Sequence, residues 1–222
     1  APGKTLGVAW GNTVSAVINH IAPHSMPGST VVQLNGAANA FDSGTLYSDS
    51  IISTLAKAYD SSAVHFPVPA FFDYVETKNA LVRERSIRRV LDVIDSCDLV
   101  VFGVGAMDPA MPSHVYAGGY LSSTELKEAR EDGVVGDICT VLIREDGTTD
   151  MPLNARASGP LPAQLKRIST RLCVVAGSAK VPALLGALRA GVVTDLIIDS
   201  SAARALVHRR REVGRGDLPG TL

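Results

Sequence analysis

The sequence predicts an α/β protein built on a Rossmann-like, doubly wound and mostly parallel sheet. Short apolar runs that end at glycine or a polar residue recur along the chain, and segments with helical periodicity lie between them. Near-continuous apolar runs are typical of strands buried on both faces of a parallel sheet. Because strands and helices alternate, we expect βαβ crossovers between neighbouring strands. The chain has 222 residues, 46% of them hydrophobic, which is enough for a sizeable core without metals or disulfides.

Each expected element follows from this alternating pattern. The expected strands cover residues 5–10, 30–34, 63–66, 99–104, 172–176 and 196–198. The expected helices cover residues 13–21, 46–59, 86–96, 124–132, 181–190 and 202–208. One stretch breaks the alternation and predicts a small antiparallel excursion: an apolar run at 138–143, a turn at Glu145-Asp146-Gly147, and a segment through Met151 and Leu153.

Charge and composition narrow the function. The net charge of −1 lacks the basic footprint of a nucleic-acid binder, and the one dense basic run, 208–211, is interpreted as part of a solvated tail. No apolar run approaches the roughly 20 residues that span a bilayer, and no secretion signal is evident. The cysteines Cys97, Cys139 and Cys173 are far apart and expected to be reduced, so the predicted location is the cytoplasm. Because a strand follows Ala1 almost at once and no methionine precedes it, we expect an upstream part to be missing.

Three glycine turns that follow expected strands are candidate anion sites. They contain Gly11-Asn12-Thr13, Gly105-Ala106 and Gly177-Ser178, and Lys180 follows the last of them. The N–H groups at a helix start favour a phosphate, and turns at the carboxyl ends of parallel strands share one crevice. A cation one turn into a helix is disfavoured by the helix dipole, so an anion would explain Lys180. The alternatives are that Asn12 or Thr13 only caps a helix, and that Lys180 is simply exposed.

Other polar residues near the strand ends are candidate hydroxyl ligands. Asp137 follows a glycine turn, and a carboxylate can accept hydrogen bonds from a pair of sugar hydroxyls. Gln33, Asn35 and Gly36 end the second expected strand and could contact the same hydroxyls. No GxSxG, HExxH, Walker or GxGxxG motif occurs, and the five histidines show no metal-binding spacing. We therefore expect a binding domain and no enzyme, without a cofactor or a metal.

Seven stretches of the chain carry a family resemblance: residues 7–13, 32–36, 98–105, 119–122, 133–137, 176–180 and 196–199. In this order they resemble the sugar-binding effector domain of SorC/DeoR-type bacterial transcriptional regulators. The resemblance implies the NagB/RpiA/CoA-transferase-like fold of glucosamine-phosphate deaminase and ribose-phosphate isomerase, used to sense a sugar or sugar phosphate. It also implies an effector domain over residues 1–208 and an N-terminal helix-turn-helix DNA-binding domain absent from this chain. From the basic run we expect a basic, flexible tail over 209–222.

The resemblance assigns roles to single residues. Gly11, Asn12 and Thr13 match the family's first phosphate-contacting turn, Gly105 and Ala106 a second wall, Asp137 the hydroxyl-binding acid, and Lys180 the phosphate-binding lysine. It further implies a homodimer or homotetramer that binds operator DNA through the missing domain.

Some positions depart from the family pattern. Residues 35–37 stand where many relatives have a glycine pair, so we favour a monophosphate, a free sugar or a polyol. Ser178 replaces a glycine, and Ser200 replaces an acidic residue.

Several hypotheses stay open on the sequence alone. The favoured one is an allosteric sensor whose ligand bridges the helix starts and the loops 41–44 and 71–78. A related isomerase or deaminase would need a pair of acids after a strand, and none is evident. Lys78 or Lys180 could form a Schiff base with an aldehyde sugar if burial removes its proton. A purely structural oligomerisation module would leave three anion-ready turns without a role.

Overall fold

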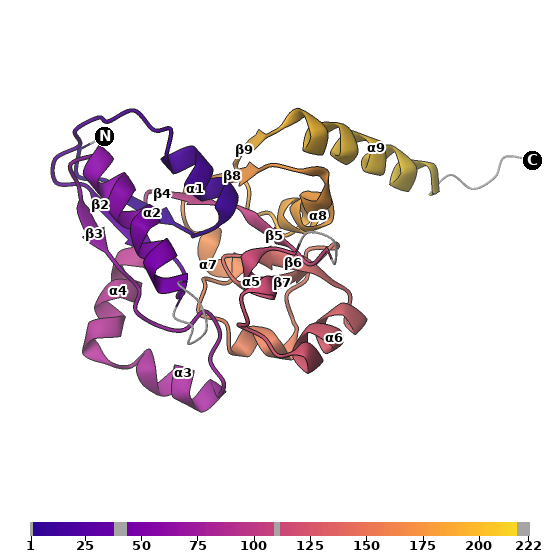
Figure 1. Ribbon diagram of the computed structural model, residues 1–222, viewed down its shortest axis with the longest axis horizontal. Helices are drawn as coiled ribbons and strands as arrows, with labels where there is room; N and C mark the ends of the chain where they lie inside the picture. The colour runs from indigo at the N-terminus through magenta and orange to yellow at the C-terminus, as the bar shows by residue number, and fades with distance from the viewer. Residues whose placement is uncertain (1, 38–43, 109–111, 217–222) are drawn as a thin grey trace, which may run out of the picture.

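A six-stranded parallel sheet forms the centre of the computed structural model, which describes residues 2–37, 44–108 and 112–216 (Figure 1). Its order is β3-β2-β1-β4-β8-β9, and every neighbouring pair is parallel. The strands are β1 (Thr5–Val8), β2 (Thr30–Gln33), β3 (Ser62–Val64), β4 (Leu99–Phe102), β8 (Thr170–Val175) and β9 (Asp195–Ile198). The strand order turns back between β1 and β4, as in a doubly wound sheet. The predicted fold class is therefore confirmed.

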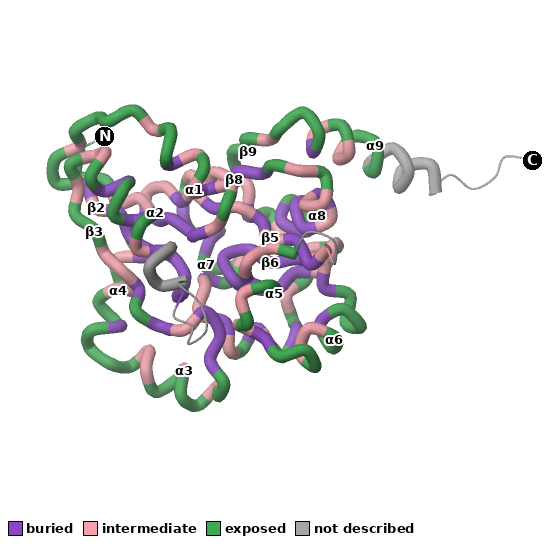
Figure 2. The backbone as a smooth tube through the Cα atoms, in the orientation of Figure 1, coloured by how far each residue is buried: buried purple, intermediate pink, exposed green. Residues whose placement is uncertain are grey.

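Helices cover both faces of this sheet. α1 (Asn12–Ile18) and α2 (Gly44–Ala58) contribute to one apolar core cluster, whereas α4 (Arg85–Asp95) and α8 (Val181–Arg189) contribute to the other. Neighbouring residues of β2 alternate between them, with Val31 in the first cluster and Val32 in the second. This follows from the strand geometry, because successive side chains point to opposite faces of a sheet. Figure 2 shows the buried residues concentrated along the strands and the exposed ones on the outer helices.

A three-stranded antiparallel sheet follows directly after β4. It contains β5 (Val104–Ala106), β6 (Val134–Ile138) and β7 (Val141–Arg144), in the order β5-β6-β7. The expected antiparallel excursion exists, but its predicted strands were misplaced. The apolar run 138–143 holds the end of β6, a turn and β7, and the segment through Met151 and Leu153 forms the 3-10 helix η1 (Pro152–Ala155).

The hairpin turn explains why this prediction was wrong. Cys139 and Thr140, which connect β6 to β7, both have positive φ, at 50° and 70°. Two-residue hairpin turns with positive φ are usually built from asparagine, aspartate and glycine. A cysteine and a β-branched threonine give no turn signal, so the run looked like one continuous strand.

The remaining helices surround the small sheet and the sheet edges. They are α3 (Val75–Leu81), α5 (His114–Ala117), α6 (Ser123–Glu131), α7 (Pro162–Leu165), η2 (Ser178–Lys180) and α9 (Ser200–Gly216). α3 and α5 were not predicted. α9 leads away from the body of the molecule (Figure 1). The residues expected to form a tail from Arg209 onward continue this helix as far as Gly216.

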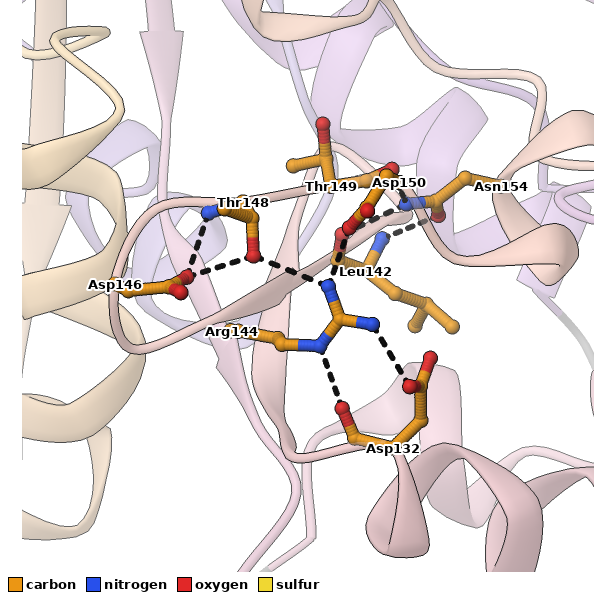
Figure 3. A network of polar contacts seen from close by, with 8 residues as sticks. All are labelled: Asp132, Leu142, Arg144, Asp146, Thr148, Thr149, Asp150 and Asn154. Atoms are coloured by element: carbon orange, nitrogen blue, oxygen red, sulfur yellow. Dashed lines mark hydrogen bonds and ion pairs between the residues drawn. The ribbon is translucent and has the colours of Figure 1, made fainter.

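A surface network fixes the small sheet to the loop that follows it (Figure 3). Arg144 Nε donates to the Asp132 carbonyl at 2.6 Å, and its Nη2 lies 2.8 Å from Asp132 Oδ1. Its Nη1 donates to the Asp150 carboxylate and, at 3.1 Å, to the Thr148 hydroxyl. Asp146 Oδ1 in turn accepts from the Thr148 hydroxyl at 2.7 Å. We call these five residues the Arg144 cluster.

Candidate functional site

A cavity of about 440 Å³ lies where the strand order turns back, beyond the carboxyl ends of β1 and β4. Ligands of open α/β sheets bind in this position, because neighbouring loops diverge there. The loops after β1, β2, β4 and β8 and the β6–β7 hairpin all contribute to its wall. The lining residues with polar or charged side chains are Trp10, Asn12, Thr13, Asn35, Ser113, His114, Asp137, Cys139, Thr140 and Lys180.

The turn after β1 opens onto this cavity. Gly11 precedes α1 with extended backbone, and a Cβ there would meet nothing within 4 Å. The N-cap position of α1 is Gly11, so neither Asn12 nor Thr13 is the N-cap residue. Thr13 instead uses its hydroxyl to accept a hydrogen bond from Lys180 Nζ at 2.8 Å.

Lys180 ends η2 and points its ammonium group into the cavity. It is half-buried, so the alternative of a simply exposed lysine is wrong. Burial lowers the pKa of Lys180, while the negative charge of Asp137 acts in the opposite direction. The charged lysine is thus partly deprived of water, and we call Lys180, Thr13 and Asp137 the cavity cluster.

Asp137 on β6 is the buried carboxylate of the cavity, with an exposed fraction of 4%. Its Oδ2 accepts from the Thr140 N–H at 3.0 Å, whereas Oδ1 is buried without a hydrogen-bond partner in the protein. Burial raises the pKa of Asp137 to about 6, against the opposing effects of the Thr140 N–H, the Tyr116 hydroxyl and Lys180. The Tyr116 hydroxyl is near enough to act on the carboxyl, but the two groups form no hydrogen bond of normal geometry.

Gly105 is required by the position of this carboxylate. A Cβ at Gly105 would lie 1.8 Å from Asp137 Oδ1, so any larger residue would displace the carboxylate from its observed position. The prediction that Gly105-Ala106 form a glycine turn at a helix start was wrong, because these residues belong to the strand β5. Gly105 lines the cavity. Ala106 does not line it, and its buried backbone N–H donates to the Ser113 hydroxyl at 2.7 Å.

The three candidates at the end of β2 separate into two groups. Asn35 lines the cavity, is 1% exposed, and keeps a buried Oδ1 without a hydrogen-bond partner. Gln33 lies outside the lining, with its amide bonded to the Asn35 carbonyl at 2.8 Å and to the Phe66 N–H at 3.2 Å. Gly36 also lies outside the lining, because its carbonyl accepts from Trp10 Nε1 at 2.9 Å and a Cβ would meet the Val68 carbonyl at 2.3 Å.

Other sequence candidates lie away from the cavity. Gly177, with φ +96°, and the exposed Ser178 build the turn before Lys180 but are not among its lining residues. Lys78 donates to the Ala155 carbonyl at 3.0 Å, and burial lowers its pKa, but it does not line the cavity either. Of the expected loop 41–44, residues 41–43 fall outside the described residues. No residue of the loop 71–78 lines the cavity.

The sequence reasoning missed an aromatic group at the cavity. Trp10 stacks on Tyr120 with ring centroids 5.7 Å apart, and His114 meets the Trp10 ring edge-on at 5.7 Å. Trp10 and His114 line the cavity. Trp10 lies within the stretch 7–13 that carries the family resemblance, and it is the chain's one tryptophan, which could have marked it. His114, on α5, has no comparable signal in the sequence.

The comparisons with known proteins identify the family of the chain. Residues 1–208 match the Sugar-bind family model, described as "Putative sugar-binding domain". The chain belongs to this family. Membership in this family confirms the resemblance stated from the sequence. In this sugar-binding domain the cavity lies where the strand order of the parallel sheet turns back.

The relatives are transcriptional regulators. The deoxyribonucleoside regulator of Bacillus subtilis (strain 168) is 30% identical over 208 residues, or 93% of this chain and 65% of that protein. A domain of a "possible sugar-binding transcriptional regulator" from Arthrobacter aurescens TC1 is 43% identical, with a TM-score of 0.86 over 93% of this chain and 79% of that chain. The full-length sorbitol operon regulator SorC from Klebsiella pneumoniae shares the fold, with a TM-score of 0.82 at 20% identity, over 92% of this chain and 66% of that chain.

These comparisons set the general class of the sugar-binding domain. The chain spans 65% of the length of the Bacillus regulator, and the matched proteins are regulators and not enzymes. Among the described residues, no helix has the length and apolar character to cross a membrane. The same residues contain no group of three or more His, Cys, Asp or Glu side chains placed to hold a metal ion.

Proposed function

We propose that this domain senses a phosphorylated sugar or polyol for a bacterial transcriptional regulator. The polarity of the cavity carries the proposal. Lys180 and Thr13 offer an ammonium group and a hydroxyl, whereas Asp137 Oδ1 and Asn35 Oδ1 are buried acceptors without a protein partner. Buried acceptors without partners are unfavourable, so a ligand with hydroxyl donors and an anionic group would satisfy both needs.

The number of cations favours a ligand with one phosphate. Lys180 is the one lysine or arginine among the described residues that line the cavity. The open turn at Gly11 adds N–H groups at the start of α1, which favour an anion in the same way. A bisphosphate would need a second basic group, and residues 35–37, at the position of a family glycine pair, supply none.

Binding is proposed to act through the assembly of the whole regulator. In the cytoplasm, the full-length protein would be a homodimer or homotetramer that binds operator DNA through an N-terminal domain outside this chain. A ligand shifts such an equilibrium only by its different affinity for the two states. The names of the matched proteins support this arrangement, because they describe a deoxyribonucleoside regulator, a possible sugar-binding transcriptional regulator and a sorbitol operon regulator.

A ligand titration tests the proposal. Trp10 is the chain's one tryptophan and lines the cavity, so its fluorescence should report binding directly. Pentose and hexose monophosphates, the same sugars without phosphate, and polyols form the panel, and thermal unfolding gives a second readout. A member at 100 times its Kd should stabilise the domain by about 2.7 kcal/mol.

The control variants separate the cavity from the general surface. Lys180→Met should abolish the response to sugar phosphates, whereas Lys166→Met, at an exposed site, should leave it unchanged. No response across the whole panel would contradict the sensing function. Equal affinity for a sugar and its phosphate would contradict the phosphate part of the proposal.

A further inference from the structure

Asp199 lies outside the cavity and connects two elements of the fold. It follows β9 and occupies the N-cap position of α9. Its Oδ1 accepts from the Ala202 N–H at 2.7 Å and from the Ser201 hydroxyl at 3.0 Å. Its Oδ2 accepts from the Gly177 N–H at 3.1 Å. One carboxylate therefore joins the first turn of α9 to the turn that precedes Lys180.

The Gly177 turn gains from this support because glycine, which has no side chain, can readily leave the conformation that it adopts here. Gly177 has φ +96°, a region that side-chain-bearing residues rarely adopt, and no neighbouring atom lies within 4 Å of where its Cβ would be. Packing therefore does not hold the turn from that side. Gly177 has two described hydrogen bonds. Its N–H donates to the Asp199 carboxylate, and its carbonyl accepts from the Lys180 N–H at 3.2 Å.

The position of Lys180 depends on that turn. Its ammonium group reaches Thr13 across the cavity, and burial disfavours its charged form there. A looser turn would let the ammonium group move toward water, because solvation of the charge improves along that path. The bonds to Ala202 and Ser201 hold the Asp199 carboxylate in place, and these bonds, with that from Gly177, keep its pKa below the ordinary value.

We propose that Asp199 is a positioning residue that holds the Gly177 turn so that Lys180 faces the cavity, and that joins this turn to the start of α9. The part that concerns the ligand rests on the proposed function, because it assumes that Lys180 contacts an anion. Since both bonds use one carboxylate, a change in the turn reaches the first turn of α9. α9 leads away from the body of the domain, so it is placed to pass the change outward (Figure 1).

Three variants separate capping of α9 from support of the turn. Asp199→Ser keeps a favoured N-cap residue, but its side chain is too short to reach Gly177 as well. Asp199→Ala removes both functions. Asp195→Ser is the matched control, because Asp195 is an exposed acid at the start of the same strand that bonds to Thr194 instead of the turn.

The first measurement needs no ligand. The pKa of Lys180, followed by NMR titration of its side chain, should rise in Asp199→Ser and Asp199→Ala and stay unchanged in Asp195→Ser. Removing a negative charge would by itself lower a lysine pKa, so a rise reports movement of the ammonium group toward water. Amide exchange over residues 200–206 should stay slow in Asp199→Ser and become fast in Asp199→Ala.

The second measurement uses inorganic phosphate as the probe, with Trp10 fluorescence as the signal. Asp199→Ser should weaken phosphate binding by between about two- and fivefold. Phosphate should slow amide exchange over 200–206 in the wild type and in Asp195→Ser, and this effect should vanish in Asp199→Ser.

The outcomes distinguish the two proposals. An unchanged Lys180 pKa in Asp199→Ser overturns the positioning role, whether or not phosphate binds. An α9 exchange rate that responds to phosphate equally in Asp199→Ser overturns the link to α9. If neither phosphate nor the sugar panel binds the wild type, the proposed function fails, while the Lys180 titration still decides the role of Asp199.

Discussion

The cavity cluster and the Arg144 cluster both combine acids with a base, but their electrostatics are opposite. In the Arg144 cluster, the hydrogen bond that Asp150 accepts from Arg144 lowers the pKa of Asp150. The hydrogen bond between Arg144 and Asp132 raises the pKa of Arg144. Each charged form is stabilised by its neighbours. In the cavity cluster burial raises the pKa of Asp137 and lowers that of Lys180, so both charged forms are destabilised.

The difference separates a structural cluster from a binding site. The Arg144 guanidinium donates its hydrogen bonds to a loop and to the end of a helix (Figure 3). The side chain of its partner Asp150 is 80% exposed to water. The cavity cluster instead keeps a buried Asp137 oxygen without a partner beside an ammonium group short of water. Such groups gain most from a ligand, because the ligand replaces the missing solvation.

The largest expected effect comes from crowding the cavity carboxylate. In Gly105→Ala the new Cβ would lie 1.8 Å from Asp137 Oδ1, so the buried carboxylate must leave its place beside the Thr140 N–H. We expect the free energy of unfolding to fall by about 3 kcal/mol or more. Denaturant unfolding measures this, with Gly11→Ala as the control, because a Cβ at Gly11 meets nothing within 4 Å. Equal stability of the two variants would contradict the packing described for Asp137.

The next effect is the pH dependence of stability. Because the folded pKa of Asp137 is raised from 3.8 to about 6, the folded state binds a proton more tightly than the unfolded state. Stability should therefore be greatest below pH 4 for this group and fall by up to about 3 kcal/mol as the pH rises to 7. Asp137→Asn should lack this fall, which denaturant unfolding at several pH values would show.

The Arg144 cluster supplies the opposite control for that experiment. The pKa of Asp150 is lowered, so its contribution is present at neutral pH and is lost as the pH falls through the folded pKa. Asp150→Asn should thus change the pH profile in the reverse direction and by a small amount, since the side chain is solvated. Parallel profiles of the wild type and Asp137→Asn would remove the distinction between the clusters.

A smaller effect should appear within the cavity cluster itself. In Lys180→Met the positive charge that favours the ionised carboxyl disappears, so the pKa of Asp137 should rise above about 6. The interaction is on the order of 1 kcal/mol. NMR titration of the Asp137 carboxyl carbon measures it, with Lys166→Met as the control. A fall in the pKa would mean that the two charges do not interact as described.

The smallest effect is expected at the surface. Arg144→Lys keeps the charge but loses the planar group that contacts Asp132 and Asp150 together. The free energy of unfolding should fall by less than about 1 kcal/mol, and high salt should reduce the difference. A loss as large as that of Gly105→Ala would show that the surface cluster, and not the cavity, governs stability here.

The sequence predicted the strands well because their signal is local. Buried parallel strands need continuous apolar runs, and the runs at 30–34 and 172–176 overlap β2 and β8 closely. The hairpin was misplaced because Cys139 and Thr140 take positive φ without glycine. α5 was missed because it has four residues, too few for a helical period to be visible.

The candidate site was predicted in outline and corrected in detail. Seven predicted residues line the cavity: Gly11, Asn12, Thr13, Asn35, Gly105, Asp137 and Lys180. Gln33 and Gly36 lie within two residues of Asn35 in the sequence, but their polar groups are bonded within the protein. Residue type and sequence position could not separate Asn35 from Gln33 and Gly36, because the three differ only in whether their polar groups face the cavity or bond to other parts of the protein.

The amino-acid sequence by itself determined the alternation of strands and helices, the glycine turns and the family, because each depends on local pattern. The tertiary structure alone decided which groups meet. Lys180 and Thr13 are 167 residues apart, and their contact exists because β1 and β8 flank β4 in one sheet. The raised pKa of Asp137 likewise arises from burial by segments distant in the chain, and burial is a property of the packed molecule.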